Sequence, residues 1–124
     1  MILLIEDEEF TAGLIAALLA PAPVRHARNG LEGLQLFRSE PFDMIITDLV
    51  MPVKDGLSTI TDVRKFAPSI PILAISIGGN LGGLRNLQIA KKLGATATLA
   101  KPFERVQLME KIEECLAATE GHPC

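Results

Sequence analysis

Aromatic residues and cysteines are scarce in this 124-residue sequence, which has no tryptophan, no tyrosine and two cysteines, Cys115 and Cys124. The cysteines form no CxxC motif and are too few for a disulfide framework, so we expect a reducing, cytoplasmic setting. The 12 lysines and arginines are scattered rather than clustered, and the net charge is −3. This balance argues against direct binding of nucleic acid.

Long apolar segments are missing as well. No stretch approaches the roughly 18 consecutive apolar residues of a membrane span. The apolar residues 1–5 are followed by acidic residues at 6–9, whereas a signal peptide has a basic start and a longer apolar region. We therefore expect no contact with a membrane. With 48% hydrophobic residues, a chain of this length is expected to form one domain with a buried core.

Short apolar runs alternate with longer segments whose apolar residues have helical spacing. The runs, typical of strands buried on both faces, cover residues 2–5, 24–27, 44–47, 72–76 and 97–100. The last two helices are predicted from Leu84, Leu87, Ile89 and Leu93 and from residues 106–116. Between the fourth run and the fourth helix, the GGNLGG stretch at 78–83 predicts a mobile loop.

Five strands alternating with five helices predict an α/β domain whose parallel sheet is covered by helices on both faces. We expect this domain to occupy residues 1–118 and residues 119–124 to form a frayed tail. In such a sheet, ligands bind at the carboxyl ends of the strands. The sequence therefore directs attention to the residues that directly follow each apolar run.

Polar residues follow four of the five predicted strands. Glu6 and Asp7 end the first strand, Asp48 the third, Ser76 the fourth and Lys101 the fifth. Because these ends meet at one edge of the sheet, three carboxylates would repel one another there. Mg²⁺, which prefers carboxylate, water and phosphate oxygens, would remove that repulsion.

The same set of residues suits phosphoryl transfer. A carboxylate such as Asp48 can act as a nucleophile on phosphorus. Lys101 supplies the positive charge that the incoming phosphoryl oxygens need, and Ser76 can donate a hydrogen bond to one of them. The pattern therefore favours a magnesium-dependent phosphoacceptor site.

Four motifs occur in a characteristic order: LLIEDE at 3–8, DMIITDLVMPVKDG at 43–56, ILAIS at 72–76 and GATATLAKPF at 94–103. Together they resemble the receiver domain of bacterial two-component response regulators, of the chemotaxis-receiver type, over about residues 1–118. The resemblance implies a flavodoxin-like, doubly wound (βα)5 fold with a five-stranded parallel sheet in the order 2-1-3-4-5.

The resemblance also implies a role for each site residue. Asp48 corresponds to the phosphoacceptor. Asp7 corresponds to a direct Mg²⁺ ligand and Glu6 to an acid acting through water, while Val50 would contribute its backbone carbonyl to the metal. Ser76 corresponds to the switch hydroxyl. Lys101 corresponds to the phosphate-binding lysine, with Pro102 as its cis-proline partner.

Three positions depart from the family pattern. Thr98 stands at a switch position where the family usually has an aromatic residue, so the usual coupling of hydroxyl and aromatic side chains cannot operate here. The glycine run at 78–83 replaces a segment that is commonly charged. Val50 and Gly78, at positions that tend to set the phosphate lifetime, cannot orient an attacking water with a side chain, which predicts slow autodephosphorylation.

The resemblance implies a signalling switch rather than a metabolic enzyme. A sensor histidine kinase or phosphotransfer protein would phosphorylate Asp48, and the change would reach the face formed by the fourth helix and fifth strand. That face would act on a downstream protein or on an output domain missing from this chain, and phosphorylation-dependent dimerisation is a further form of output.

Two other functions are compatible with parts of the sequence. One is a receiver-like interaction module that works without phosphorylation, which the complete set of acids, hydroxyl and lysine argues against. The other is a Mg²⁺-dependent phosphohydrolase of the haloacid-dehalogenase kind, which also uses an aspartate nucleophile after a strand. That family needs a second acid two residues later, where this chain has Val50.

Overall fold

A computed structural model describes residues 1–77 and 81–120 of the chain. Its strands are β1 (Ile2–Ile5), β2 (Val24–Ala27), β3 (Met44–Asp48), β4 (Ile72–Ile77) and β5 (Ala97–Lys101). Its helices are α1 (Glu9–Leu19), α2 (Gly30–Ser39), α3 (Gly56–Phe66), α4 (Leu81–Leu93) and α5 (Arg105–Glu120). All strand pairs are parallel, in the order β2-β1-β3-β4-β5. The predicted doubly wound α/β fold and its strand order are confirmed.

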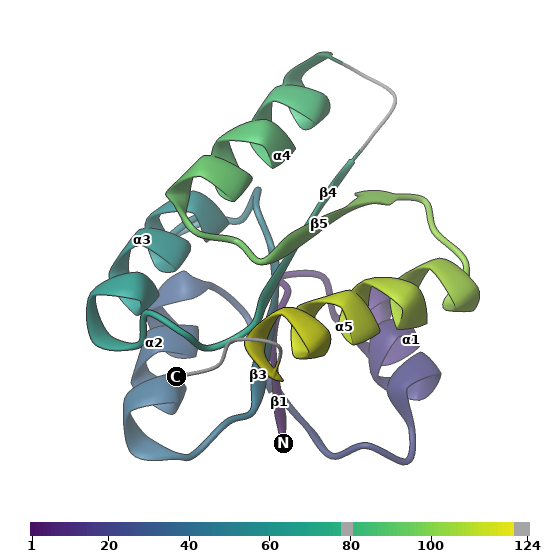
Figure 1. Cartoon of the computed structure of the whole chain (residues 1–124), viewed down its shortest axis with the longest axis horizontal. Coiled ribbons are helices and arrows are strands. Elements are labelled where there is room, and N and C mark those ends of the chain that lie inside the picture. The colour runs from purple at the N-terminus through teal and green to yellow at the C-terminus, as the bar shows by residue number, and fades with distance from the viewer. Residues whose placement is uncertain (78–80, 121–124) are drawn as a thin grey trace.

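The sheet separates two apolar layers (Figure 1): α2, α3 and α4 cover one face, and α1 and α5 cover the other. Successive side chains of a strand point to opposite faces, so Leu3 and Ile5 belong to the first layer and Leu4 to the second. Both faces are buried, which explains why the strands appear in the sequence as continuous apolar runs. No helix of the described residues is long and apolar enough to cross a membrane.

Side-chain caps set the start of two helices that lead away from the carboxyl edge. The Asn29 side chain accepts a hydrogen bond from the Glu32 amide at 2.9 Å, before α2. The Asp55 side chain accepts one from the Ser58 amide at 2.8 Å, before α3. Each cap satisfies an amide that the first helical turn leaves without a partner. Asp55 thus directs the chain into α3 only a few residues after β3 ends.

The start and phase of α4 differ from the prediction. Residues 81–83 belong to its first turn rather than to a loop, while residues 78–80 lie outside the described residues. The buried side of the helix contains Gly83, Leu87 and Ala90, whereas Leu84 is exposed. Glycine costs about 1 kcal/mol in a helix, but packing on β4 and β5 supplies most of a helix's stability and outweighs that cost.

The ends of β4 and α5 also differ slightly from the expected boundaries. Strand β4 continues one residue further, to Ile77, and α5 continues to Glu120. Most of the predicted tail, residues 121–124, lies outside the described residues. These differences leave the sheet order and the position of the site unchanged.

Gly56 lets α3 begin directly against the end of β3. Its amide donates to the Leu49 carbonyl at 3.0 Å, and a Cβ atom at this position would lie 2.2 Å from the Asp48 carbonyl oxygen and 2.7 Å from the Leu49 Cα. Both obstacles are backbone atoms, which cannot move aside as the end of a flexible side chain can. A residue larger than glycine would therefore displace the strand end that carries Asp48.

We expect Gly56→Ala to lower the free energy of unfolding by roughly 1–3 kcal/mol, the usual cost of overpacking. Gly13→Ala is the matched control, because Gly13 lies within α1 and a Cβ there meets nothing within 4 Å. That change should raise stability by about 0.5–1 kcal/mol. Urea denaturation followed by far-UV circular dichroism measures both, and equal stability of Gly56→Ala and wild type would disprove the close-approach argument.

Candidate functional site

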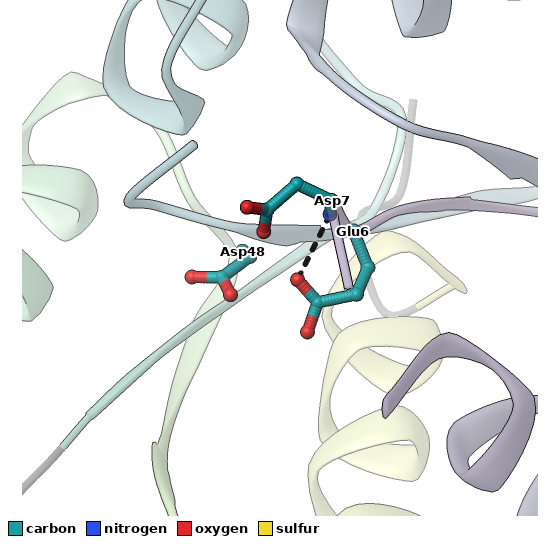
Figure 2. Close-up of side chains that lie close together, drawn as sticks. All are labelled: Glu6, Asp7 and Asp48. Atoms are coloured by element: carbon teal, nitrogen blue, oxygen red, sulfur yellow. Dashed lines mark hydrogen bonds between the residues drawn. The ribbon is translucent and has the colours of Figure 1, made fainter. Parts of the chain in front are cut away.

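Three carboxylates meet at the carboxyl edge of the sheet because β1 and β3 are neighbours. Glu6 and Asp7 directly follow β1, and Asp48 is the last residue of β3. One carboxylate oxygen from each residue lies within 4.8 Å of the others, and Figure 2 shows the three side chains around one small space. Glu6 is held in part by the Asp7 amide, which donates to its Oε2 at 3.1 Å.

Lys101 lies between two of these acids. Its Nζ is 2.7 Å from Asp48 Oδ2 and 2.9 Å from Glu6 Oε1. Burial by itself lowers the pKa of this ammonium group, but the hydrogen bonds and charges of Asp48 and Glu6 outweigh burial and raise the pKa above its ordinary value. The following peptide bond, Lys101-Pro102, is cis. The lysine therefore remains charged and stabilises two acids at once.

Glu6 is the most buried member of the cluster, with 2% of its surface exposed. Burial is the main cause that raises its pKa from 4.5 to about 7, and a hydrogen bond to Asp48 adds to the rise, while Lys101 only partly opposes it. The pocket thus combines three carboxyl groups with one ammonium group. An all-oxygen donor set with a deficit of positive charge suits a hard divalent cation such as Mg²⁺.

Ser76 and Val50 complete the pocket around Asp48. The Val50 amide donates to Asp48 Oδ1 at 3.2 Å, and its side chain is 65% exposed. Ser76 lies near the end of β4 and is 2% exposed. The pocket has a volume of about 330 Å³, and its lining includes Asp48, Val50, Ser76, Ile77, Asn86 and Lys101. The residues predicted from the strand ends therefore do share one edge.

The sequence reasoning missed two residues near this edge. His26, on β2, places its Nε2 2.7 Å from the Glu6 carbonyl oxygen, and because a carbonyl only accepts, the ring nitrogen donates and holds the backbone beneath Glu6. Asn86 reaches the pocket from α4. Its signal is a polar residue three positions after Gly83 and four before Ala90, on the inward side of the helix.

Thr98 does not lie in this pocket. It is half-buried on β5, and it lines a separate groove between α4, β5 and α5, beside Leu87 and Lys111. Gly78, which was predicted together with Val50 to affect the phosphate lifetime, lies outside the described residues. Thr98 is therefore placed by the structure on the face formed by α4 and β5 rather than beside Asp48.

Comparisons with known proteins identify the family. Residues 2–113 match the model of the response regulator receiver domain. The chain is similar to the chemotaxis protein CheY of Halobacterium salinarum, with 27% identity across 94% of this chain and 97% of that protein. It is also similar to the crystal structure of a receiver domain protein from Clostridium thermocellum, with a TM-score of 0.86 and 28% identity, covering 96% of this chain and 95% of that one.

The chain belongs to the response regulator receiver domain family. Receiver domains are signalling domains of two-component systems, where they work with histidine kinases and output domains, and they bind Mg²⁺ in an acidic pocket. Other relatives are longer. The chain matches 26% of the transcriptional regulatory protein ZraR of Klebsiella oxytoca, at 32% identity, and 50% of the probable C4-dicarboxylate response regulator DctR of Bacillus subtilis, at 27%.

We expect Lys101→Met to lower the free energy of unfolding by about 2 kcal/mol at pH 7.5 in the absence of metal. The value is below the range for a fully buried ion pair, because the Lys101 side chain is 22% exposed and Glu6 can take up a proton. The folded-state pKa of Glu6, about 7, exceeds its ordinary 4.5, so Glu6 lowers the stability of the fold progressively as the pH rises from 4.5 to about 7. The loss should therefore shrink at pH 5, where Glu6 is protonated.

Lys92→Met is the matched control, because Lys92 is an exposed residue of α4 and its loss should change stability by less than about 0.5 kcal/mol at either pH. Urea titrations at pH 5 and 7.5 provide the comparison. If Lys101→Met and Lys92→Met cost the same, Lys101 does not stabilise the acids.

Proposed function

We propose that this chain is a phosphorylation switch in which Asp48 accepts a phosphoryl group from a phosphohistidine of a sensor histidine kinase or phosphotransfer protein. The observation that supports this best is the position of the Asp48 carboxylate. It lines an open pocket together with Ser76 and Lys101, and Lys101 holds one of its oxygens at 2.7 Å. A carboxylate held in this way is oriented toward a ligand that enters the pocket.

The transfer forms one bond and breaks another. A carboxylate oxygen of Asp48 attacks phosphorus, the phosphorus–nitrogen bond of the phosphohistidine breaks, and its electron pair stays on the imidazole nitrogen. Lys101 Nζ already donates a hydrogen bond to the attacking carboxylate. After transfer, it can donate to a phosphoryl oxygen and stabilise the negative charge there. The buried Ser76 hydroxyl can donate to another phosphoryl oxygen.

Glu6, Asp7, Asp48 and the backbone carbonyl of Val50 would hold Mg²⁺, which when bound offsets the negative charge of the carboxylates and of the phosphoryl oxygens. The fit rests on the three carboxylate oxygens within 4.8 Å of one another, which together form the all-oxygen donor set that Mg²⁺ prefers. Asp7 is the exposed member of the three acids, so it is the one most accessible to a hydrated ion.

The acyl phosphate would then bias an equilibrium between two conformations of the face formed by α4 and β5. The altered face would bind a downstream protein, an output domain or a second copy of the chain. Relatives such as ZraR carry this domain within a longer regulatory protein, which makes an output domain one natural partner. We place this function in the cytoplasm, where histidine kinases present their phosphohistidine.

The phosphohydrolase alternative is disfavoured by the residue two positions after the nucleophile. A hydrolase of that kind needs an acid there, and Val50 presents an exposed apolar side chain beside the pocket instead. An inert interaction module would leave Asp48 unmodified, so the same experiment separates it from the switch.

Incubation with acetyl phosphate and Mg²⁺ should add one phosphoryl group to the intact protein, and Asp48→Asn should abolish this gain because an amide is not a nucleophile toward phosphorus. Asp62→Asn is the control: Asp62 pairs with Lys54 and Lys65 away from the pocket, so this variant should be phosphorylated like wild type. Intact-mass spectrometry gives the result. An unmodified wild-type protein would favour the inert module.

We further propose that the phosphoryl group on Asp48 is lost slowly, because Val50 offers no polar atom from its side chain to orient an attacking water. Val50→Gln supplies such an atom and should speed decay by roughly tenfold, a modest share of what a positioned polar group contributes to catalysis. Val53→Gln is the control, because Val53 lies in the same loop and is 77% exposed.

The decay is followed by intact mass after the phosphodonor is removed. Slow loss in wild type and in Val53→Gln, with faster loss in Val50→Gln, is the expected pattern. A wild-type decay as fast as that of Val50→Gln would show that Val50 does not limit hydrolysis.

A further inference from the structure

Asn86 is a polar residue on the inward side of a helix that is otherwise apolar there. The spacing from Gly83 to Asn86, Leu87 and Ala90 is three, four and seven residues, so all four share one side of α4. Gly83, Leu87 and Ala90 are buried, and Asn86 is half-buried. Asn86 lines the pocket around Asp48, so its amide group can offer hydrogen bonds to a group bound there.

Within residues 1–77 and 81–120, no hydrogen bond to the Asn86 side chain is formed, although the residue lines the pocket that contains Asp48, Ser76 and Lys101. Gly83, one turn earlier, lines the same pocket without a side chain. Asn86 is thus the residue of α4 whose side chain offers hydrogen-bond donors at the phosphoacceptor.

We propose that the Asn86 amide group donates a hydrogen bond to the phosphoryl group carried by Asp48, and that this bond connects the phosphoryl group directly to α4. The inference rests on the proposed phosphorylation of Asp48. Phosphoryl oxygens are strong, charged acceptors, and hydrogen bonds to charged acceptors are stronger than those between neutral groups. Asn86 acts as a positioning residue, since it does not attack, protonate or leave.

The far end of α4 is anchored, so a bond at Asn86 would act on the near end. Arg64 Nε donates to the Gly94 carbonyl at 2.8 Å, directly after the helix, and Arg64 Nη1 donates to the Ala67 carbonyl at 3.0 Å. The Lys91 ammonium donates to the Thr96 carbonyl. If α4 is held at its C-terminal end and bound to the phosphoryl group near its start, phosphorylation would shift the whole helix rather than its first turn alone.

This connection supplies an output route that does not depend on an aromatic switch residue. Thr98 lines the groove between α4, β5 and α5 and is not among the residues that line the pocket around Asp48. Asn86 lies on the same helix that forms one wall of that groove. A change at the pocket would therefore reach the groove through α4 itself.

The test uses beryllofluoride, a stable mimic of the phosphoryl group, with Mg²⁺ and the full chain. Fluorine NMR should show bound resonances in wild type, with one of them shifted in Asn86→Ala, and the half-saturating beryllofluoride concentration should rise roughly tenfold, as expected for one hydrogen bond to a charged group. Hydrogen exchange of α4 should slow on binding in wild type and much less in Asn86→Ala.

Gln88→Ala is the matched control, because it removes a similar amide from an exposed position two residues along α4. It should bind and respond like wild type. Alanine favours helix, so Asn86→Ala is expected to fold with an unchanged or higher melting temperature, and Asn86→Asp, which places a carboxylate beside the phosphoryl mimic, should bind more weakly than Asn86→Ala.

The outcomes separate the two levels of the proposal. If wild type binds no beryllofluoride in an Asp48-dependent manner, the proposed function itself fails. If wild type binds but Asn86→Ala matches it in half-saturation, fluorine shifts and α4 exchange, the connection through Asn86 is wrong. Slower decay of the acyl phosphate in Asn86→Ala, with unchanged beryllofluoride affinity, would assign Asn86 to the attacking water instead and would also overturn the inference.

Discussion

The contact of one lysine with two acids is the interaction on which the site depends. Lys101 Nζ lies 2.7 Å from Asp48 and 2.9 Å from Glu6, and it joins the end of β5 to the ends of β1 and β3. A buried carboxylate such as Glu6 is costly without a cation, and one ammonium group between two acids leaves that cost only partly offset. The fold thus maintains an acidic pocket with a lysine between two of its acids, which is the setting that we propose for Mg²⁺ and the phosphoryl group.

The backbone makes this arrangement possible. Parallel pairing of β1 with β3 and of β4 with β5 brings four strand ends to one edge, and Gly56 allows α3 to leave that edge without covering Asp48. On the other side, α4 approaches the pocket with Gly83 and Asn86. Asp48 is therefore positioned by the sheet, while one side of the pocket is formed by a helix whose start contains two glycines, Gly82 and Gly83.

The strands and the residues at their ends were predictable from the sequence, because apolar runs buried on both faces are hard to mistake and each run ends in, or is followed by, a charged or hydroxyl residue. The start of α4 was not. Gly82 and Gly83 favour a loop by local preference, and only the packing of Leu87 and Ala90 on the sheet shows that the helix begins earlier.

The same error in the phase of α4 concealed Asn86. A helix predicted to bury Leu84 and Ile89 turns Asn86 away from the sheet, whereas the observed helix buries Gly83, Leu87 and Ala90 and turns Asn86 toward the pocket. The contact of His26 with the Glu6 carbonyl was beyond the sequence for a different reason. It depends on the register of β2 against β1, which the apolar pattern of so short an edge strand does not specify.

The central claim, that the carboxylate held by Lys101 is the one that carries the phosphoryl group, is tested most directly by locating the acyl phosphate in the chain. Reduction with borohydride converts a phosphorylated aspartate to homoserine, and tandem mass spectrometry of the digested protein assigns the converted residue. The account predicts homoserine at position 48, formed only after treatment with phosphodonor and Mg²⁺. Conversion at Asp7 or at any other acid, with position 48 intact, would contradict it.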